Sequence, residues 1–208
     1  GPWKNLKHTN IELSGKTLGI YGLGRIGKEL AKKALALDVK IQYFDILRQF
    51  DVEKELDLKY VFPEELLKKS DIISYHVPKT TFTHKIINQT SLKMMRSNSL
   101  LINASRGDVQ DENAIYQALI SGEIYAAGLD VFEVEPLPLN SPLRDLKNVV
   151  LTPHSAPDRE CYVRAVNHAL ENLLKVSKGE VPQSLAVNYE KETHKFLKLF
   201  PDVKFFTS

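Results

Sequence analysis

The chain has 208 residues, of which 43% are apolar and 26% are charged, and its formal net charge at pH 7 is +2. This balance is typical of a soluble globular protein that is long enough to bury one large core. The lysines are scattered among acidic residues and form no basic stripe, so a nucleic-acid partner is not expected.

Cysteine content and hydropathy also limit the cellular location and the kinds of site that the chain can carry. No apolar run approaches the roughly 20 residues of a membrane span and no signal peptide opens the chain, so we expect no membrane partner and a cytoplasmic location. Cys161 is the only cysteine, which excludes an internal disulfide and a cysteine-rich zinc site. No metal site is expected. Because Cys161 lies in a helical pattern, we expect it to pack rather than to act as a nucleophile.

The most informative segment covers residues 17–27 and reads TLGIYGLGRIG. An apolar, β-branched strand pattern leads into Gly22, Gly24 and Gly27, and a helical pattern follows. Gly22 permits a tight turn, Gly24 lets a pyrophosphate approach the backbone, and Gly27 lets the helix pack closely on the strand. The N-terminus of the helix offers free N–H groups to phosphates. The segment predicts a dinucleotide-binding turn, against the alternative of an ordinary strand-to-helix connection.

A second apolar strand ends in Asp45, about two dozen residues after Gly22, where a ribose-binding carboxylate is expected. The 2′-phosphate of NADP would bring like charge to within roughly 4 Å of this carboxylate, at a cost of about 4 kcal/mol for an effective dielectric of about 20. NAD is therefore the expected cofactor. Arg48 could in principle contact a phosphate, but with Asp45 ahead of it we interpret Arg48 as a solvated loop arginine.

Apolar runs alternate with helical segments along the chain. The predicted strands are 17–21, 41–44, 60–62, 72–75, 100–103, 125–130 and 149–151, and the predicted helices are 26–37, 63–69, 89–95, 111–121 and 159–178. Strands rich in Val, Ile and Leu that alternate with helices indicate a parallel sheet covered on both faces. The predicted fold class is therefore α/β, a Rossmann-type doubly wound parallel sheet of about seven strands. Residues 188–208 show no strong period.

Polar residues follow the later strands, at the sheet edge where ligands bind in such folds. His76, Arg106 and His154 each come shortly after a predicted strand, Asp130 is the last residue of one, and Glu135 follows in the segment after Asp130. Taken singly, each has an ordinary structural explanation, such as a loop histidine, a surface cation, a turn former, a helix-dipole partner or a cap. Their common position at one edge favours a binding site.

Five motifs follow one another along the chain: TLGIYGLGRIG, HVPKTTFTHKIIN, LLINASRGD, AAGLDVFEVEPLP and NVVLTPHSA. Together they resemble the successive signatures of the D-isomer-specific 2-hydroxyacid dehydrogenases, and the resemblance covers about Trp3 to Asn188. That family includes phosphoglycerate, glyoxylate/hydroxypyruvate, D-lactate and formate dehydrogenases, and a group of NAD-dependent transcriptional corepressors.

The resemblance implies a role for each matching position. Arg106 matches the arginine that holds the substrate carboxylate and C2 oxygen, His154 matches the catalytic histidine, and Glu135 matches the acid paired with it. Asp130 matches the aspartate at the nicotinamide carboxamide. The residues expected along the cofactor are Gly22, Leu23, Gly24, Arg25, Ile26, Gly27, Asp45, His76, Val77, Pro78, Thr83, Ala104, Ser105, Arg106, Asp130, His154 and Ala156.

The chain departs from the family pattern at few positions. Gln110 replaces the usual aliphatic residue after the arginine motif, and Pro157 and Asp158 stand where small residues are commoner. Family members also carry, before the position of Trp3, most of a second, flavodoxin-like domain that closes over the substrate. The chain is therefore expected to be a truncated protein that holds the cofactor but turns over poorly on its own.

The implied domain division is an NAD-binding domain over 1–188 and a C-terminal tail over 189–208 that is a remnant of the substrate domain. The apolar side chains of this tail are expected to lack a partner. They are Phe196, Leu197, Leu199, Phe200, Val203, Phe205 and Phe206. The alternative is a helix packed on the NAD-binding domain.

The implied chemistry is reversible hydride transfer between NAD(H) and a small 2-keto or 2-hydroxy acid, by an oxidoreductase acting on a CH–OH group. His154 is expected to donate the proton with support from Glu135, and Arg106 to clamp the substrate carboxylate. Family resemblance also implies a homodimer through the NAD-binding domain, with the region from Val134 to the start of the long helix at the interface.

Two other hypotheses compete with this one. An NAD-binding regulatory or corepressor-like module without significant turnover stays open, because the corepressors keep the same three catalytic residues. A methyltransferase or flavin protein that uses the same glycine-rich turn is disfavoured by Arg106, Asp130 and His154 together.

Overall fold

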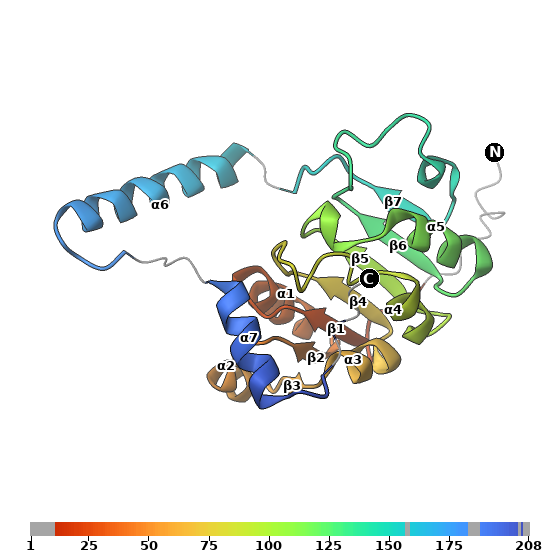
Figure 1. Cartoon of the computed structure of the whole chain (residues 1–208), viewed down its shortest axis with the longest axis horizontal. Helices are drawn as coiled ribbons and strands as arrows, with labels where there is room; N and C mark the ends of the chain where they lie inside the picture. Colours follow the sequence, from red (N-terminus) through yellow and green to blue (C-terminus); the bar gives the residue numbers. More distant parts are fainter. Residues whose placement is uncertain (1–10, 157–158, 183–187, 204, 206–208) are drawn as a thin grey trace.

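The structure, a computed structural model, describes residues 11–156, 159–182, 188–203 and 205. Trp3, Pro157, Asp158 and Phe206 lie outside the described residues. Seven strands form one parallel sheet in the order β3-β2-β1-β4-β5-β6-β7, with helices on both faces (Figure 1). The predicted Rossmann-type, doubly wound sheet is confirmed.

Each predicted strand is present, with ends that differ by no more than a few residues. The strands are β1 (Thr17–Tyr21), β2 (Lys40–Phe44), β3 (Lys59–Tyr60), β4 (Ile72–Tyr75), β5 (Leu100–Asn103), β6 (Ala126–Leu129) and β7 (Val149–Leu151). The chain runs outward from β1 through β2 to β3 and then returns to form β4 on the other side of β1. The strand order therefore reverses between β1 and β4, and ligands bind at the carboxyl ends of such a switch point.

The helices confirm the predicted segments. Helix α2 was not predicted, and α7 was predicted only as the alternative for the C-terminal segment. The helices are α1 (Arg25–Leu35), α2 (Phe50–Leu56), α3 (Pro63–Lys69), α4 (Gln89–Met94), α5 (Glu112–Ser121), α6 (Arg159–Ser177) and α7 (Tyr189–Leu199), with short 3-10 turns η2 (Gly107–Val109) and η3 (Pro142–Asp145). None of the residues of α2 is buried. Only the partly buried Val52 and Leu56 of this short helix pack on the core, which is too weak an apolar period for a sequence to predict it.

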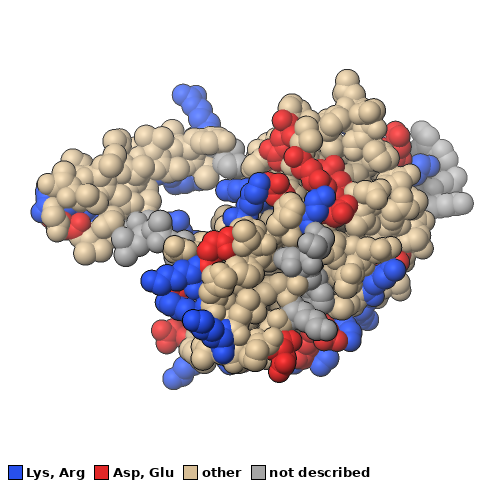
Figure 2. All heavy atoms as spheres, viewed as in Figure 1, with Lys and Arg blue, Asp and Glu red and all other residues tan. Residues whose placement is uncertain are grey.

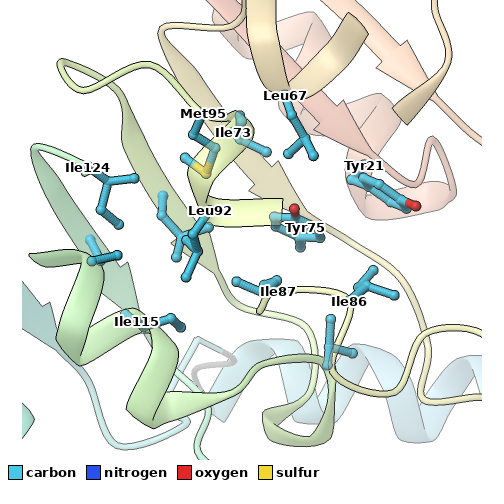
Figure 3. Close-up of a cluster of buried hydrophobic side chains, with 14 of the residues drawn as sticks. Tyr21, Leu67, Ile73, Tyr75, Ile86, Ile87, Leu92, Met95, Ile115 and Ile124 are labelled. Carbon is cyan, nitrogen blue, oxygen red and sulfur yellow. The ribbon is translucent and has the colours of Figure 1, made fainter. Parts of the chain in front are cut away.

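The larger apolar core lies on the face of the sheet covered by α3, α4 and α5 (Figure 3). Ile73 of β4 and Leu101 of β5 are fully buried, and they pack in one cluster with Leu92 of α4 and Ile115 of α5. Each such side chain contributes about 1.5–3 kcal/mol when it is fully buried. This packing fixes the carboxyl ends of the central strands, where the expected site residues follow.

Helix α6 extends away from the sheet as a separate arm (Figure 1), and none of its residues is buried. Cys161 lies in this helix, as the sequence predicts, and is partly exposed. The arm is mostly uncharged in the view of Figure 2. Its exposed large apolar side chains are Tyr162, Val163, Val166, Leu170, Leu173, Leu174 and Val176.

Helix α7 packs against the domain, so the expectation that the C-terminal apolar side chains lack a partner is wrong for part of this segment. The Asn188 side chain caps the helix by accepting a hydrogen bond from the Lys191 N–H at 3.0 Å. Phe196 is only 5% exposed, and its ring centroid lies 5.7 Å from that of Phe44 at the end of β2. The alternative, a helix packed on the domain, is the arrangement found, because Phe44 offers aromatic surface at the sheet edge.

Candidate functional site

The glycine-rich turn joins β1 to α1 and leaves one side of its backbone open. Gly22 has a φ of 99°, which favours glycine, and a Cβ there would lie 2.7 Å from the carbonyl oxygen of His76. A Cβ on Gly27 would lie 2.3 Å from the Gly22 carbonyl oxygen, so Gly27 permits close packing of helix and turn. Gly24 faces open space and begins α1 without a side-chain cap. The open side can therefore accept a phosphate at the helix N-terminus.

Asp45 lies at the end of β2 and is fixed beside this turn. Its Oδ2 accepts a hydrogen bond from the Leu23 N–H at 2.7 Å, and its Oδ1 accepts one from the Leu47 N–H at 2.9 Å. Burial raises the pKa of Asp45, and the two backbone hydrogen bonds oppose this effect. The carboxyl group is thus held at the position where the sequence predicts a ribose-binding acid.

Arg48 binds other side chains of the same chain. Its Nε and Nη2 donate hydrogen bonds of 2.8 and 2.9 Å to the two carboxylate oxygens of Glu53. The guanidinium group also lies over the rings of Phe50 and Tyr60, at 4.7 and 4.6 Å from their centroids. This bidentate pairing engages its donors, which agrees with the interpretation of Arg48 as a loop arginine rather than a phosphate ligand.

The loop after β4 lies against the glycine-rich turn. The His76 Nε2 is 2.8 Å from the Ser74 Oγ, and burial lowers the pKa of His76 to about 4, so its imidazole is neutral near pH 7. Thr83 closes the loop, because its hydroxyl donates a 2.6 Å hydrogen bond to the Pro78 carbonyl and accepts one from the Thr80 N–H. Thr83 therefore shapes the loop through its own hydroxyl.

A cavity of about 60 Å³ lies where the turn, Asp45 and this loop meet. Residues of α7 and Phe205 complete its wall. The structure thus brings together seven of the residues expected along the cofactor: Gly22, Gly24, Asp45, His76, Val77, Pro78 and Thr83.

Arg106 lies in the loop after β5, which is tightly packed on its inner side. The Asn103 Oδ1 accepts hydrogen bonds from the Ser105 N–H at 3.0 Å and from the Ser105 hydroxyl at 2.7 Å. A Cβ on Gly107 would lie 1.8 Å from the Phe132 carbonyl oxygen, so only glycine permits this approach to the segment after β6. The Arg106 side chain is exposed, and its Nη1 donates to the Ser105 carbonyl at 2.6 Å.

Gln110 is a residue whose role the sequence did not predict. It is fully buried, its Nε2 donates a 2.8 Å hydrogen bond to the Val131 carbonyl, and its Oε1 accepts one of 2.8 Å from the Asn103 Nδ2. The side chain therefore ties the loop that carries Arg106 to the end of β6. The only signal for this role was a polar residue where the family pattern has an aliphatic one.

Asp130 connects the ends of β6 and β7. Its Oδ1 accepts hydrogen bonds from the Thr152 hydroxyl and from the Ser155 N–H, the latter at 3.1 Å. Burial acts to raise the pKa of Asp130, but these hydrogen bonds outweigh burial and hold the pKa below its usual value. Asp130 is therefore an ionised side chain with a fixed orientation.

Glu135 and His154 form a hydrogen-bonded pair at the same edge. The His154 Nδ1 lies 2.8 Å from the Glu135 Oε2, and the Glu135 Oε1 accepts a 3.0 Å hydrogen bond from the Phe132 N–H. The hydrogen bond with His154 lowers the pKa of Glu135. His154 has a φ of 51°, a left-handed conformation that is uncommon outside glycine and concentrates at functional sites.

A cavity of about 530 Å³ lies beside this pair, and its lining includes Phe132, Leu137 and Arg144. Arg106 does not line it, and in the described part of the chain no hydrogen bond or ion pair joins Arg106 to Glu135 or His154. The structure brings the predicted histidine and acid together and leaves the predicted arginine at a separate strand end.

The other expected cofactor residues differ in exposure. Leu23 is buried beneath the turn, whereas four residues are exposed: Arg25, Ile26, Ala104 and Ala156. Among the described residues no cluster of His, Cys, Asp and Glu is suited to a metal ion. In that same part of the chain, none of the helices has the length and apolar character needed to cross a bilayer.

Comparison with known proteins places these features in a family. The sequence model described as "D-isomer specific 2-hydroxyacid dehydrogenase, NAD binding domain" matches residues 1–156. A glyoxylate reductase of Korarchaeum cryptofilum is 45% identical over 195 residues, which cover 91% of this chain and 58% of the relative. A hydroxypyruvate reductase of Thermotoga maritima is 46% identical over 156 residues, which cover 74% of this chain and 50% of the relative.

A solved structure agrees with these relatives. The D-isomer specific 2-hydroxyacid dehydrogenase of Lactobacillus delbrueckii ssp. bulgaricus, in its NAD-complexed form, superposes with a TM-score of 0.75 at 32% identity, covering 86% of this chain and 58% of that one. The chain thus spans only about half of the length of the relatives that it matches. It belongs to the D-isomer specific 2-hydroxyacid dehydrogenase family, as a member that carries the family's NAD-binding domain.

Proposed function

We propose that this chain provides the cofactor site and the acid–base pair of an oxidoreductase that interconverts 2-keto and 2-hydroxy acids with NAD(H). The observation that carries the proposal is the 2.8 Å contact between the His154 Nδ1 and the Glu135 Oε2 beside a cavity of about 530 Å³. It lies at the sheet edge that also carries the glycine-rich turn. A pair of this kind is suited to general acid–base catalysis near neutral pH.

The residues present fit the cofactor that the family implies. The open backbone at Gly24 suits the pyrophosphate, Asp45 the ribose hydroxyls, and Asp130 the nicotinamide carboxamide. When bound, NAD(H) supplies or accepts the hydride. Because Asp45 is a carboxylate beside the turn and Arg48 is engaged by Glu53, the site favours NAD over NADP.

The side chains of the chain itself move the proton and orient the acid. With Nδ1 held by Glu135, the opposite nitrogen of His154, Nε2, is the atom that gives the proton to the C2 oxygen and takes it back in the reverse direction. Arg106 binds the substrate carboxylate in a bidentate pair, which fixes the position of C2. The exposed guanidinium of Arg106 is free to adopt that geometry, because in the described part of the chain its hydrogen bond is to the neighbouring Ser105 carbonyl.

The proposed substrate is a small 2-keto acid of the size of glyoxylate or hydroxypyruvate. Two relatives carry these compounds in their names, a glyoxylate reductase and a hydroxypyruvate reductase. A cavity of about 530 Å³ beside His154 is ample for so small an acid. The competing hypothesis of a regulatory, corepressor-like module gains no support from these relatives.

NADH oxidation in the presence of glyoxylate or hydroxypyruvate tests the proposal. His154→Gln is expected to lower the single-turnover rate by roughly 10²–10⁴, since general acid catalysis contributes about that factor. His84→Gln is the matched control, because His84 is exposed and lies outside the site. Equal rates for the two variants would refute the role of His154.

We also propose a homodimer, a cytoplasmic location and a division of the chain at residue 188. The dimer is supported by the exposed apolar side chains of α6 and of the preceding segment, where Leu139 is 90% exposed. The location is consistent with a single cysteine, which forms no internal disulfide. The division into an NAD-binding domain and a remnant of the substrate domain is supported by the arm of α6, after which α7 begins at Tyr189.

A further inference from the structure

Helix α7 and Phe205 lie on the part of the groove where the adenosine half of the cofactor is expected. Tyr189 and Thr193 of α7 and Phe205 line the same cavity as Gly22 and Asp45. That cavity measures about 60 Å³. Pockets that bind small molecules usually measure about 300–1,000 Å³, so with α7 in place the space does not admit an adenosine.

A bidentate contact fastens α7 to the loop after β4. The Glu190 Oε1 accepts a 2.8 Å hydrogen bond from the Thr81 N–H, and the Glu190 Oε2 accepts one of 2.7 Å from the Thr81 hydroxyl. The two residues are 109 positions apart in the sequence. These hydrogen bonds lower the pKa of Glu190, so the carboxylate holds the loop at neutral pH. The loop is the one that carries Pro78 and Thr83 of the expected cofactor site.

Aromatic rings form the second contact. The Phe205 ring centroid lies 6.0 Å from that of Phe44 and 6.3 Å from that of Phe82. Phe44 directly precedes Asp45, and Phe82 directly precedes Thr83. Phe205 therefore covers the apolar surface between the two segments that are expected to enclose the adenine and its ribose.

The contact has the properties of a docked segment rather than of a permanent core. Glu190 is only partly buried, and Leu199 on the outer side of α7 is 75% exposed. Among the described residues the Tyr21 hydroxyl, which borders the cavity under α7, is buried without a hydrogen-bond partner. Figure 3 shows Tyr21 at the edge of the core with its hydroxyl directed away from the aliphatic side chains. An unpaired buried hydroxyl disfavours the closed arrangement.

We propose that α7 and Phe205 are an intramolecular plug that covers the adenosine half of the NAD groove and competes with adenine nucleotides. This inference rests on the assignment of the groove to NAD. No residue of α7 lines the cavity beside Glu135 and His154, so the plug is confined to the adenosine half. The apparent affinity for NAD(H) equals the affinity of the undocked form multiplied by the fraction of molecules in which the plug is undocked. Bound nucleotide in turn releases α7.

Hydrogen exchange of the full chain, with AMP as the probe, tests the release directly. A ligand normally slows the exchange of the segments that it touches, and the residues 22–27 and 76–83 are expected to follow this rule. The residues 189–199 are expected to exchange faster when AMP is bound, because α7 leaves the groove. Nicotinamide mononucleotide is the control ligand, because it lacks the adenosine and is expected to leave exchange in α7 unchanged.

Variants of the plug test the competition through NADH binding measured by calorimetry. Glu190→Gln and Phe205→Ala each weaken a contact of the plug, so each is expected to bind NADH roughly three- to tenfold more tightly than the unaltered chain. Lys198→Ala is the matched control on the exposed side of the same helix and is expected to bind NADH with unchanged affinity.

Slower exchange in α7 with AMP bound, or affinities of both variants equal to that of Lys198→Ala, would overturn the plug. Weaker NADH binding by Phe205→Ala would also overturn it, since Phe205 would then be part of the cofactor site. Failure of every variant to bind AMP and NADH overturns both the plug and the assignment of the groove. Tighter binding of NADH by the two variants without any oxidation of NADH supports the plug and counts only against the proposed reaction.

Discussion

The buried side chains of Asn103 and Gln110 are joined by a 2.8 Å hydrogen bond that links the end of β5 to the segment before α5. Asn103 also orders the loop of Arg106 through Ser105, while Gln110 continues to the Val131 carbonyl at 2.8 Å. Both side-chain amides are therefore satisfied inside the domain, as buried polar groups require. The network positions the segment that carries the proposed substrate-binding arginine.

Gln110→Leu is expected to destabilise the protein by about 1–3 kcal/mol, although leucine is closer to the family's usual residue at this position. The leucine leaves the Val131 carbonyl and one donor of Asn103 without this partner in a buried place. Urea unfolding measures the effect, with Gln117→Leu on the exposed face of α5 as the control. A Gln110→Leu protein as stable as the control would show that the network does not contribute to stability.

The sequence predicted the sheet well because its central strands β1 and β4 are almost entirely buried. The run of β1, Thr17–Tyr21, and that of β4, Ile72–Tyr75, were predicted with the observed ends, since continuous apolar runs flanked by turns have few other solutions. Helix α7 was predicted only as the alternative for the C-terminal segment, because its side chains mix charged and apolar residues and only Thr193 and Phe196 are buried. Its place is decided by a tertiary contact with Phe44.

The site was predictable in part for a similar reason. A parallel sheet brings all strand ends to one edge, so Glu135 and His154 could be expected near each other. Their orientation depends on the left-handed backbone at His154 and on the hydrogen bond from Phe132 to Glu135, which no local pattern encodes. The covering of the Asp45 region by α7 depends on a segment more than a hundred residues away and was equally beyond prediction.

Asp45→Asn is expected to reduce the preference for NADH over NADPH. The amide keeps an oxygen for the Leu23 N–H but removes the negative charge, which opposes a 2′-phosphate by about 4 kcal/mol at roughly 4 Å. The dissociation constant for NADPH divided by that for NADH is therefore expected to fall by a factor of roughly 10²–10³. Calorimetric titration with both cofactors measures this ratio, with the exposed Asp57→Asn as the control. Equal affinities of the unaltered chain for NADH and NADPH would contradict the role of Asp45.

His76 is expected to make the folded state sensitive to acid. Burial lowers its pKa to about 4 in the folded chain from an ordinary value of 6.5, so between these pH values the unfolded chain binds a proton that the folded chain does not. The stabilising contribution of His76 is complete above its unfolded pKa and is lost as the pH falls to about 4, to an extent of about 3 kcal/mol.

The measurement is the free energy of unfolding of the unaltered chain and of His76→Asn at several pH values. Asparagine keeps a polar group near Ser74 but does not titrate, so the difference between the two proteins is expected to change by about 3 kcal/mol between neutral pH and pH of about 4. The exposed His84→Asn serves as the control for the loss of a histidine that is not buried. Parallel curves for His76→Asn and the unaltered chain would rule out the titration of a buried His76.

Leu170→Lys is expected to weaken the proposed homodimer. Leu170, Val163 and Val166 recur on α6 at helical spacing, are each more than half exposed, and form an apolar stripe that a second copy can cover. In a twofold dimer the substitution acts in both copies, and each buried leucine contributes about 1.5–3 kcal/mol, so the dissociation constant is expected to rise by at least a hundredfold.

Sedimentation equilibrium over a range of micromolar concentrations measures that constant. Ile120→Lys provides the matched control, because Ile120 is 53% exposed on α5 and lies outside the proposed interface, so its dimer is expected to dissociate like the unaltered one. A monomer at every concentration would exclude the dimer itself. Equal dissociation constants for the two lysine variants would show that a dimer forms without α6 in its interface. The segment around Val134 and Leu139 would then have to supply the buried apolar area.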